Sequence, residues 1–429
     1  MKITIIAFLF VAVFVTIVDL LGFWAYKREY SGKQSKTGKW LAIVFLGFVP
    51  VAVILAYMFF STQIRSASSP GFYAWFMASN IILALIYVPK VFFLLYYFAF
   101  ILIGKATNTI KNKRYSKELT TIRYPKISRK RFLSQVGIIF ATAPFISLLF
   151  GMHKGRFNFF TKHQKLFFPN LPSAFDGFKI IHISDIHLGS FASNYHKLEG
   201  IVDIINNEKA DVIFFTGDLV NNFYEETLGW DKVFTGLKAR YGKFSILGNH
   251  DYGDYTDWKT PREKEINFKG IVDAHKKFGF RLLRDQSLAI EKDGEEIALT
   301  GVENWGQPPF PQYGNLQKAM AGTENHPFKI LLSHDPDHWD AEVTNKTTYD
   351  LTLAGHTHGM QLGIDWKGFK WSPAKYKFKR WDGLYQHKNQ YLYVNRGLGF
   401  LGMPARIGMP PEITVLQLAK GSARASSIL

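Results

Sequence analysis

The sequence predicts an α/β domain, in which two β-sheets pack face to face as a sandwich flanked by helices, preceded by an all-α transmembrane region. Two observations predict this architecture. From Phe178 onward, short apolar and β-rich runs alternate with amphipathic helical stretches, a pattern typical of a sheet-based core. Up to residue 152, long apolar stretches dominate instead, and each approaches or exceeds the roughly 20 residues that cross a bilayer as a helix.

The transmembrane region, residues 1–152, is expected to form four helices. Its apolar stretches lie at residues 3–25, 40–60, 71–104 and 133–152. The third contains Pro89 and could cross the membrane once or twice; a single crossing gives four spans. Two ionisable residues, Asp19 and Lys90, fall within these stretches. Charged groups are costly at membrane depth, so a buried Asp19–Lys90 pair is one interpretation, and hydration of both near an interface is the other.

The Lys and Arg residues of the short loops predict the orientation, because positively charged loops remain cytoplasmic. The loops after the first and third stretches are rich in Lys and Arg, whereas residues 61–70 contain only Arg65. This pattern predicts a multi-pass protein of a bacterial inner (plasma) membrane, with everything after residue 152 on the extracytoplasmic side. Basic side chains within residues 154–165 favour the alternative, a cytoplasmic domain.

The sheet domain is expected to span residues 175–420 and to end in a polar tail, residues 421–429. The basic and aromatic segment before it, residues 153–174, is interpreted as a juxtamembrane linker, with an edge strand of the domain as the alternative. The clearest helices are predicted at residues 195–207 and 267–278. Strands are predicted at residues 179–184, 211–217, 243–248, 296–301, 329–334, 349–355, 391–397 and 412–418.

Charge and cysteine content limit the chemistry. The formal net charge is +18 and the chain contains no cysteine. The charge favours anionic partners, such as phosphate esters, anionic lipid surfaces or nucleic acid. Because thiolates are absent, any bound metal must use His, Asp, Asn or water as ligands.

Polar side chains follow five of the predicted strands at the point where each strand ends. In α/β sheets the loops at these ends form the site crevice, so we expect the side chains to converge. Carboxylates, amides and imidazoles bind hard or borderline divalent cations, and one carboxylate can bridge two ions that clamp a phosphoryl group. The pattern therefore favours two metal ions. The group comprises Asp185, His187, Asp218, Asn249, His250, His334, His356 and His358.

The blocks DIH, GDLVN, GNHD, a lone His and GHTH, in this order, resemble the calcineurin-like metallophosphoesterases over about residues 175–418. The membrane-anchored arrangement is similar to a bacterial subgroup that includes exported phosphoesterases and lipid-precursor pyrophosphatases. The resemblance implies a binuclear centre, with Asp218 as the bridging ligand and His250 as the acid beside it. It assigns Asp185, His187 and His358 to one ion, and Asn249, His334 and His356 to the other. Manganese, iron, zinc and magnesium all tolerate such ligands.

The expected reaction is hydrolysis of a phosphomonoester, phosphodiester or pyrophosphate bond by a hydroxide that bridges the metals. Residues 366–385 interleave basic and aromatic side chains. Beside a membrane anchor they are interpreted as a lip for a lipid-linked phosphate. A plain β-ribbon and a surface that binds single-stranded nucleic acid are the alternatives, although nucleic acid is not the expected partner. Arg396 and Arg406 are candidates for binding a second phosphate, or are structural salt-bridge partners.

Two other functions remain open at this point. One is an exported nucleotidase or phosphodiesterase that acts on soluble substrates. The other is a non-enzymatic membrane scaffold that retained the fold, although no expected ligand is missing. The sequence indicates no oligomeric state.

Overall fold

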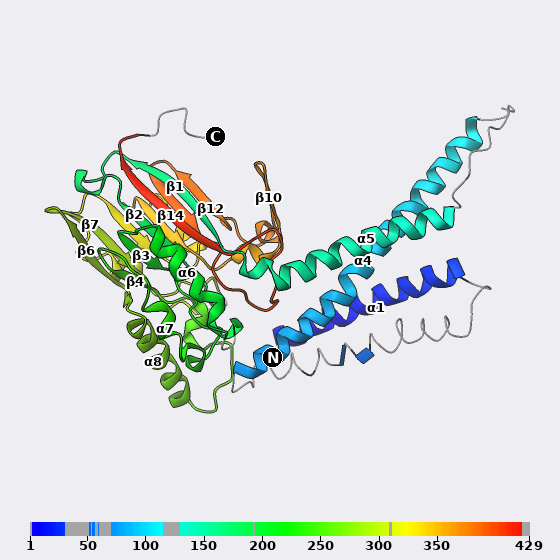
Figure 1. The fold of residues 1–429 in the computed structure, drawn as a ribbon, viewed down its shortest axis with the longest axis horizontal. Coiled ribbons are helices and arrows are strands. Elements are labelled where there is room, and N and C mark those ends of the chain that lie inside the picture. The colour runs from blue at the N-terminus through cyan, green and yellow to red at the C-terminus, as the bar shows by residue number, and fades with distance from the viewer. Residues whose placement is uncertain are drawn as a thin grey trace. The chain divides into compact units, whose positions relative to one another are not determined.

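A computed structural model describes residues 2–30, 51–52, 54–55, 59, 70–114, 129–191, 194–308 and 311–422 (Figure 1). It divides the chain into two compact units. The first comprises Met1–Ile64 and Trp75–Phe150, and the second comprises Arg65–Ala74 and Gly151–Leu429. The first unit is helical where it is described, and the second contains the β-sheets.

Among the described residues, the apolar N-terminal region forms three long helices: α1 (Lys2–Tyr30), α4 (Pro70–Arg114) and α5 (Arg129–His153). Stretches that are long and apolar enough to cross a membrane run over Leu9–Arg28, Met77–Ile103 and Gln135–Phe157, and the last of them extends past the end of α5. The third apolar stretch of the sequence lies in one helix, α4, that continues through Pro89. The span predicted at residues 40–60 falls largely outside the described residues.

A buried polar contact joins α1 to α4. Lys90 Nζ lies 2.9 Å from Asp19 Oδ1, and the Tyr87 hydroxyl donates a 2.8 Å hydrogen bond to Asp19 Oδ2. Both oxygens of this buried carboxylate therefore have partners on α4. The pair considered from the sequence is formed, in agreement with the rule that charges within membrane helices are paired with one another.

The second unit contains two six-stranded sheets and a separate two-stranded hairpin. In the first sheet, β2 to β5 run parallel and β14 is antiparallel to β2. Its strands, in spatial order, are β1 (Phe160–Phe168), β14 (Glu412–Lys420), β2 (Lys179–Ile183), β3 (Val212–Phe215), β4 (Lys243–Ser245) and β5 (Arg281–Leu282).

In the second sheet, β13, β9, β8 and β7 run parallel, and the two edge strands are antiparallel to their neighbours. Its order is β12 (Gly383–His387), β13 (Gln390–Val394), β9 (Leu351–Ala354), β8 (Lys329–Leu332), β7 (Glu295–Gly301) and β6 (Gln286–Lys292). The hairpin consists of β10 (Ile364–Trp366) and β11 (Phe369–Trp371).

The main hydrophobic core lies between the sheets. Side chains of both contribute to one buried cluster, for example Phe214 from β3 and Leu353 from β9. Helices cover the outer face of the first sheet: α6 (His196–Asn207), α7 (Asp231–Phe234) and α8 (Pro261–Lys277). A second cluster, which includes α9 (Leu316–Ala319) and the short helix Trp339–Val343, covers the second sheet. The expected sandwich is thus confirmed. Its strands are apolar on both faces because one face packs against the other sheet and the opposite face packs against helices.

The boundary of the domain differs from the predicted one. Residues 160–168, which were assigned to a juxtamembrane linker, form β1 and pair in parallel with β14 along the edge of the first sheet. The alternative, an edge strand, therefore holds for these residues, and the sheet domain begins before residue 175. Of the predicted polar tail, residues 423–429 lie outside the described part of the chain.

The contact between α1 and α4 generates a prediction about stability. Asp19→Leu removes the carboxylate that Lys90 and Tyr87 bind, and a Lys charge at membrane depth costs about 2.5–3.5 kcal/mol. We expect a lower unfolding midpoint for the full-length protein in detergent micelles. The double variant Asp19→Leu/Lys90→Leu should recover most of the loss, because no charge then remains. Thr16→Leu, an exposed position on the same helix, is the control. An unchanged midpoint for Asp19→Leu would contradict the structural role of the pair.

Candidate metal centre

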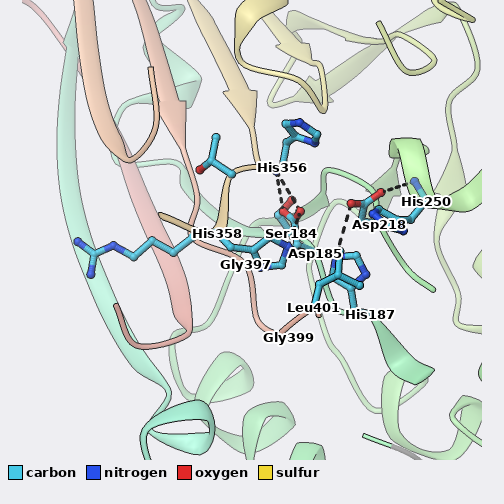
Figure 2. Close-up of polar contacts among 12 residues, drawn as sticks. Ser184, Asp185, His187, Asp218, His250, His356, His358, Gly397, Gly399 and Leu401 are labelled. Carbon is cyan, nitrogen blue, oxygen red and sulfur yellow. Dashed lines mark hydrogen bonds and ion pairs between the residues drawn. The ribbon is translucent and has the colours of Figure 1, made fainter. Parts of the chain in front are cut away.

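Five loops bring the predicted site residues together at one end of the two sheets. Three loops follow β2, β3 and β4 of the first sheet, and two follow β8 and β9 of the second. Figure 2 shows side chains from both sheets directed toward one another. The residues that converge are Asp185, His187, Asp218, Asn249, His250, His334, His356 and His358.

The first cluster contains Asp185, His187 and His358, and all three are buried. The Nε2 atoms of the two histidines lie 3.1 Å apart. Nε2 of His358 lies 3.3 Å from Asp185 Oδ1. The potential ligand atoms of the cluster all lie within 4.8 Å of one another, so one cation could contact all three side chains.

The second cluster contains Asp218, His334 and His356, again with ligand atoms within 4.8 Å of one another. Asn249 joins it, because its Oδ1 lies 3.0 Å from His334 Nε2 and 2.8 Å from His356 Nδ1. Asp218 connects the two clusters. Its Oδ2 lies 3.3 Å from His334 Nε2 in one cluster and 3.5 Å from His187 Nε2 in the other. This is the position that the resemblance implied for the bridging ligand.

Backbone carbonyls set the tautomers of three histidines. Nδ1 of His187 lies 3.1 Å from Val220 O, and Nδ1 of His334 lies 2.7 Å from Thr216 O. His250 makes the same contact, at 2.7 Å, with the carbonyl oxygen of Asn221. A carbonyl only accepts hydrogen bonds, so Nδ1 carries the proton in each ring and the lone pair of the neutral ring lies on Nε2. In His187 and His334 this is the atom that faces the clusters.

The backbone at the site is strained. Left-handed φ angles cost a non-glycine residue about 1–3 kcal/mol, and such residues concentrate at functional sites. The left-handed residues here are Asp185, His187, Asp218, His356 and His358, with φ between 50° and 72°. Gly217, at φ 91°, precedes Asp218, and a Cβ at this position would collide with the backbone of Gly248. The two loops therefore approach more closely than a side chain would permit.

Asp251 holds these two loops in place. Its buried carboxylate accepts hydrogen bonds of 2.9 Å from the backbone N–H groups of Asp218, Leu219 and Gly248. Glu226 acts similarly beside the first cluster, where it accepts from the N–H groups of Gly189 and Asn221. Sequence reasoning assigned neither residue a role. Asp251 belongs to the GNHD block, so the motif could have indicated its role. Glu226 lies in none of the motifs, so the sequence could not have indicated its role.

Burial and neighbouring charges shift the acidities within the site. Burial raises the pKa of Asp185 to about 7. Burial would also raise the pKa of Asp218, but the nearby histidines, His334 foremost, hold it well below its ordinary value. For His334, burial lowers the pKa, but the charge of Asp218 and the hydrogen bond to it outweigh burial and raise the pKa to about 10. Burial lowers the pKa of His187 to about 3.

The arrangement fits divalent cations. The donor set consists of carboxylates, imidazoles and one amide oxygen, which are ligands of hard and borderline ions. His334 Nε2 lies 3.0 Å from Asn249 Oδ1 and 3.3 Å from Asp218 Oδ2, so a cation among these atoms would be bound by all three; a divalent cation there requires a neutral His334 ring.

A cavity of about 370 Å³ opens onto both clusters. Asp218, Asn249 and His250 line its polar side. Apolar side chains form part of its remaining wall, and Lys377 adds a cation; the apolar lining residues include Pro308, Met360, Phe378 and Leu401.

The comparisons with known proteins agree with this geometry. The family model described as calcineurin-like phosphoesterase matches residues 178–360, and that of the probable calcineurin-like phosphoesterase transmembrane domain matches residues 1–156. The metallophosphoesterase YkuE of Bacillus subtilis is 33% identical over 254 residues, which are 58% of this chain and 81% of the relative. This chain belongs to the calcineurin-like metallophosphoesterases. It is therefore a hydrolase of phosphoric ester bonds.

Two further relatives extend the comparison. Phosphodiesterase YaeI of Escherichia coli is 28% identical to this metallophosphoesterase over 299 residues, which are 68% of this chain and 99% of the relative. A transmembrane protein with a metallophosphoesterase domain from Danio rerio is 28% identical over 256 residues, which are 58% of this chain and 54% of the relative.

Arg396 and Arg406, the predicted phosphate contacts, are not among the residues that line the cavity. Both side chains are buried, and both donate to groups of the protein itself. Nε and Nη2 of Arg396 each donate a 2.8 Å hydrogen bond to the carboxylate of Asp382. Arg406 donates to the backbone carbonyls of Arg396 and Gly399, and its Nη2 lies 3.1 Å from His358 Nδ1. Arg396 is thus the salt-bridge partner of the alternative interpretation, whereas the printed partners of Arg406 are backbone carbonyls and His358.

Tyr255 contacts two of the site residues and was not singled out from the sequence. Its hydroxyl accepts a 2.6 Å hydrogen bond from Nδ2 of Asn249, which turns Oδ1 of that amide toward His334 and His356. Its ring also stacks on His250, with the centroids 4.3 Å apart. Nothing in the sequence distinguishes this tyrosine from the many others, because its role depends on how the loop after Asn249 folds back.

Tyr255→Phe tests this positioning role in the metallophosphoesterase. The change keeps the ring on His250 but removes the acceptor that orients Asn249. Loss of such an outer partner typically weakens metal affinity about 10-fold or more, so we expect a weaker apparent metal affinity in titrations that follow phosphoesterase activity. Tyr313→Phe is the matched control, because that hydroxyl binds Asp254 instead. Equal metal affinity in wild type and Tyr255→Phe would refute the role.

Proposed function

We propose that this chain is a membrane-anchored phosphoesterase that uses two divalent metal ions, drawn from manganese, iron, zinc or magnesium, to hydrolyse a phosphate bond in a lipid-linked substrate. The bond is a phosphomonoester, phosphodiester or pyrophosphate. One observation carries the proposal, namely two clusters of ligand atoms that share Asp218 Oδ2 beside one cavity. A scaffold without activity would not need to maintain strained residues at both clusters.

The metals would lower the pKa of a coordinated water and neutralise charge on the phosphoryl oxygens. In the first cluster, Asp185, His187 and His358 are proposed to hold one ion. In the second, Asn249, His334 and His356 hold the other, with Asp218 shared between the two. The backbone N–H of His356 lies 3.0 Å from both oxygens of Asp185, which fixes the orientation of that carboxylate.

His250 is the proposed acid. Its Nδ1–H donates to the carbonyl of Asn221, so that Nε2 is the atom at which the ring can take up or release a proton. Its backbone N–H donates a 2.9 Å hydrogen bond to Asp218 Oδ1, and the residue lines the cavity. A proton on Nε2 can therefore be delivered to a leaving oxygen beside the clusters.

The lining of the cavity supports an amphiphilic substrate. Phosphate oxygens fit the polar side around Asp218 and His250, whereas Met360, Phe378 and Leu401 can contact the apolar part of the same molecule. The apolar helices of the N-terminal region keep the enzyme at a bilayer, which supplies such molecules. Lipid is therefore the proposed partner and nucleic acid is not.

The protein is proposed to reside in a bacterial inner membrane with the sheet domain on the extracytoplasmic side. The support is the distribution of Lys and Arg among the short loops. A cytoplasmic domain is the alternative, and the basic residues 154–165 favour it.

Phosphate release by the purified full-length protein tests the function. The panel contains lipid-linked monophosphates, diphosphates and phosphodiesters, together with nucleotides as soluble counterparts, each with and without chelator. We expect chelator-sensitive turnover of at least one lipid-linked compound, at a kcat/KM at least about 10-fold above that for any soluble counterpart. Faster turnover of nucleotides would favour the exported nucleotidase. No turnover of any compound after addition of each metal would favour the scaffold.

His250→Ala separates chemistry from metal binding in the same assay. Loss of a general acid lowers kcat by about 10²–10⁴-fold, and metal content should be retained because Nε2 of His250 is not among the clustered ligand atoms. His275→Ala, a buried histidine outside the site that contacts Ser245, controls for the loss of an imidazole from the fold. A collapse of metal content in His250→Ala would show that the role is misassigned.

A further inference from the structure

The exposed apolar side chains of the sheet domain are concentrated in one short segment. Among the described residues after 151, nine large apolar side chains are exposed, and six of them lie between residues 360 and 376. The other three, Ile204, Leu228 and Ile266, are scattered. Large apolar surfaces that remain uncovered mark interaction sites. The six are Met360, Leu362, Ile364, Trp366, Phe369 and Tyr376, with exposures between 38% and 75%.

The β10–β11 hairpin presents this surface on one of its faces. Ile364 pairs with Trp371, and Trp366 pairs with Phe369. Side chains two residues apart on a strand share a face, as do directly paired residues, so these four lie on the same side. The turn between the strands, at Lys367 and Gly368, has positive φ at both residues, as the tight turn of a two-residue hairpin requires.

The opposite face of the hairpin is tied to the domain. Asp365 and Lys370 form the intervening pair. Asp365 is in contact with the buried Arg396, and Lys370 contacts the carboxylate of Asp382 and donates a 2.9 Å hydrogen bond to its carbonyl oxygen. Because Arg396 and Asp382 are themselves joined by two hydrogen bonds, the polar face is fixed inward. The aromatic face is therefore held outward, and in Figure 1 the hairpin stands apart from the two sheets.

Cations accompany the exposed rings. Lys367 Nζ lies 5.0 Å from the ring of Trp366, and Lys375 Nζ lies 5.0 Å from the ring of Tyr376. The acid of the hairpin, Asp365, is directed to Arg396 instead. Exposed aromatic and aliphatic groups that alternate with lysines match the boundary between acyl chains and anionic headgroups.

We propose that this surface, the six exposed side chains together with Lys367 and Lys375, inserts into the interface of a bilayer that contains anionic lipid. It is a second membrane contact, separate from the apolar helices. Met360 belongs both to this surface and to the lining of the cavity, so the contact would place the cavity mouth beside lipid headgroups. The proposal concerns where the hairpin lies and holds whether or not the enzyme cleaves lipid.

Single-cysteine labelling tests the proposal, because the chain contains no cysteine of its own. Full-length Trp366→Cys and Phe369→Cys would carry a nitroxide in nanodiscs of equimolar phosphatidylcholine and phosphatidylglycerol. Leu228→Cys and Ile266→Cys, at exposed apolar positions elsewhere in the domain, are the matched controls. Collision with oxygen, which concentrates among acyl chains, is compared with collision with a water-soluble nickel complex. Unchanged thermal unfolding midpoints establish that each variant is folded.

We expect the labels at 366 and 369 to collide more with oxygen and at least 5-fold less with nickel than the two controls. Lys367→Gln/Lys375→Gln, or nanodiscs of phosphatidylcholine alone, should restore part of the nickel access. Equal nickel access at all four positions would overturn the proposal. Protection from both reagents, with dipolar broadening between labels, would indicate a second copy of the chain and would also overturn it. If the labels at 366 and 369 were immersed to the same depth without anionic lipid and without both lysines, the proposed preference for anionic lipid would be refuted.

Discussion

The site depends on one carboxylate that both sheets must reach. Asp218 follows a strand of the first sheet, and its Oδ2 meets His187 from the same sheet and His334 from the other. The loops that permit this contact contain left-handed residues and a glycine packed against backbone, which is a local cost that the sandwich core has to offset. Asp251 then fixes the loops through several backbone hydrogen bonds. The two ligand clusters are thus a consequence of where the strands of two sheets end.

Behind the clusters, a network of buried charges connects the site to the domain surface. Arg406 lies against His358 and binds the backbone around Gly399, while Arg396 binds Asp382 and reaches Asp365 on the hairpin. Such buried ion pairs contribute little net stability but fix geometry when every partner is satisfied. Here they fix a surface feature, the outward aromatic face of β10–β11, relative to the cavity. Arg396 and Arg406, which were predicted to bind substrate, therefore help to fix the position of the hairpin beside the cavity.

Much of the sandwich and the convergence of its polar loops could be predicted, because buried strands are continuous apolar runs and the metal-ligand blocks stand directly after them. β1 was predicted only as the alternative to a linker, since its FTKHQKLFF sequence is largely polar and its partner, β14, lies at the far end of the chain. The contacts of Tyr255 could not be predicted, and for Arg396 and Arg406 the sequence left phosphate binding and a structural salt bridge open, because the outcome depends on which side chains lie beside them after folding. The burial of Arg396 follows from Asp382 and Asp365, neither of which is marked by any motif.

Metal content measures the central claim, that two ligand clusters sharing Asp218 hold two ions. The purified full-length protein would be stripped with chelator, reloaded separately with manganese, iron, zinc or magnesium, freed of excess ion and analysed by mass spectrometry of the elements. The account predicts two ions per chain for at least one of these metals. A content of one ion per chain or less with all four metals would contradict it.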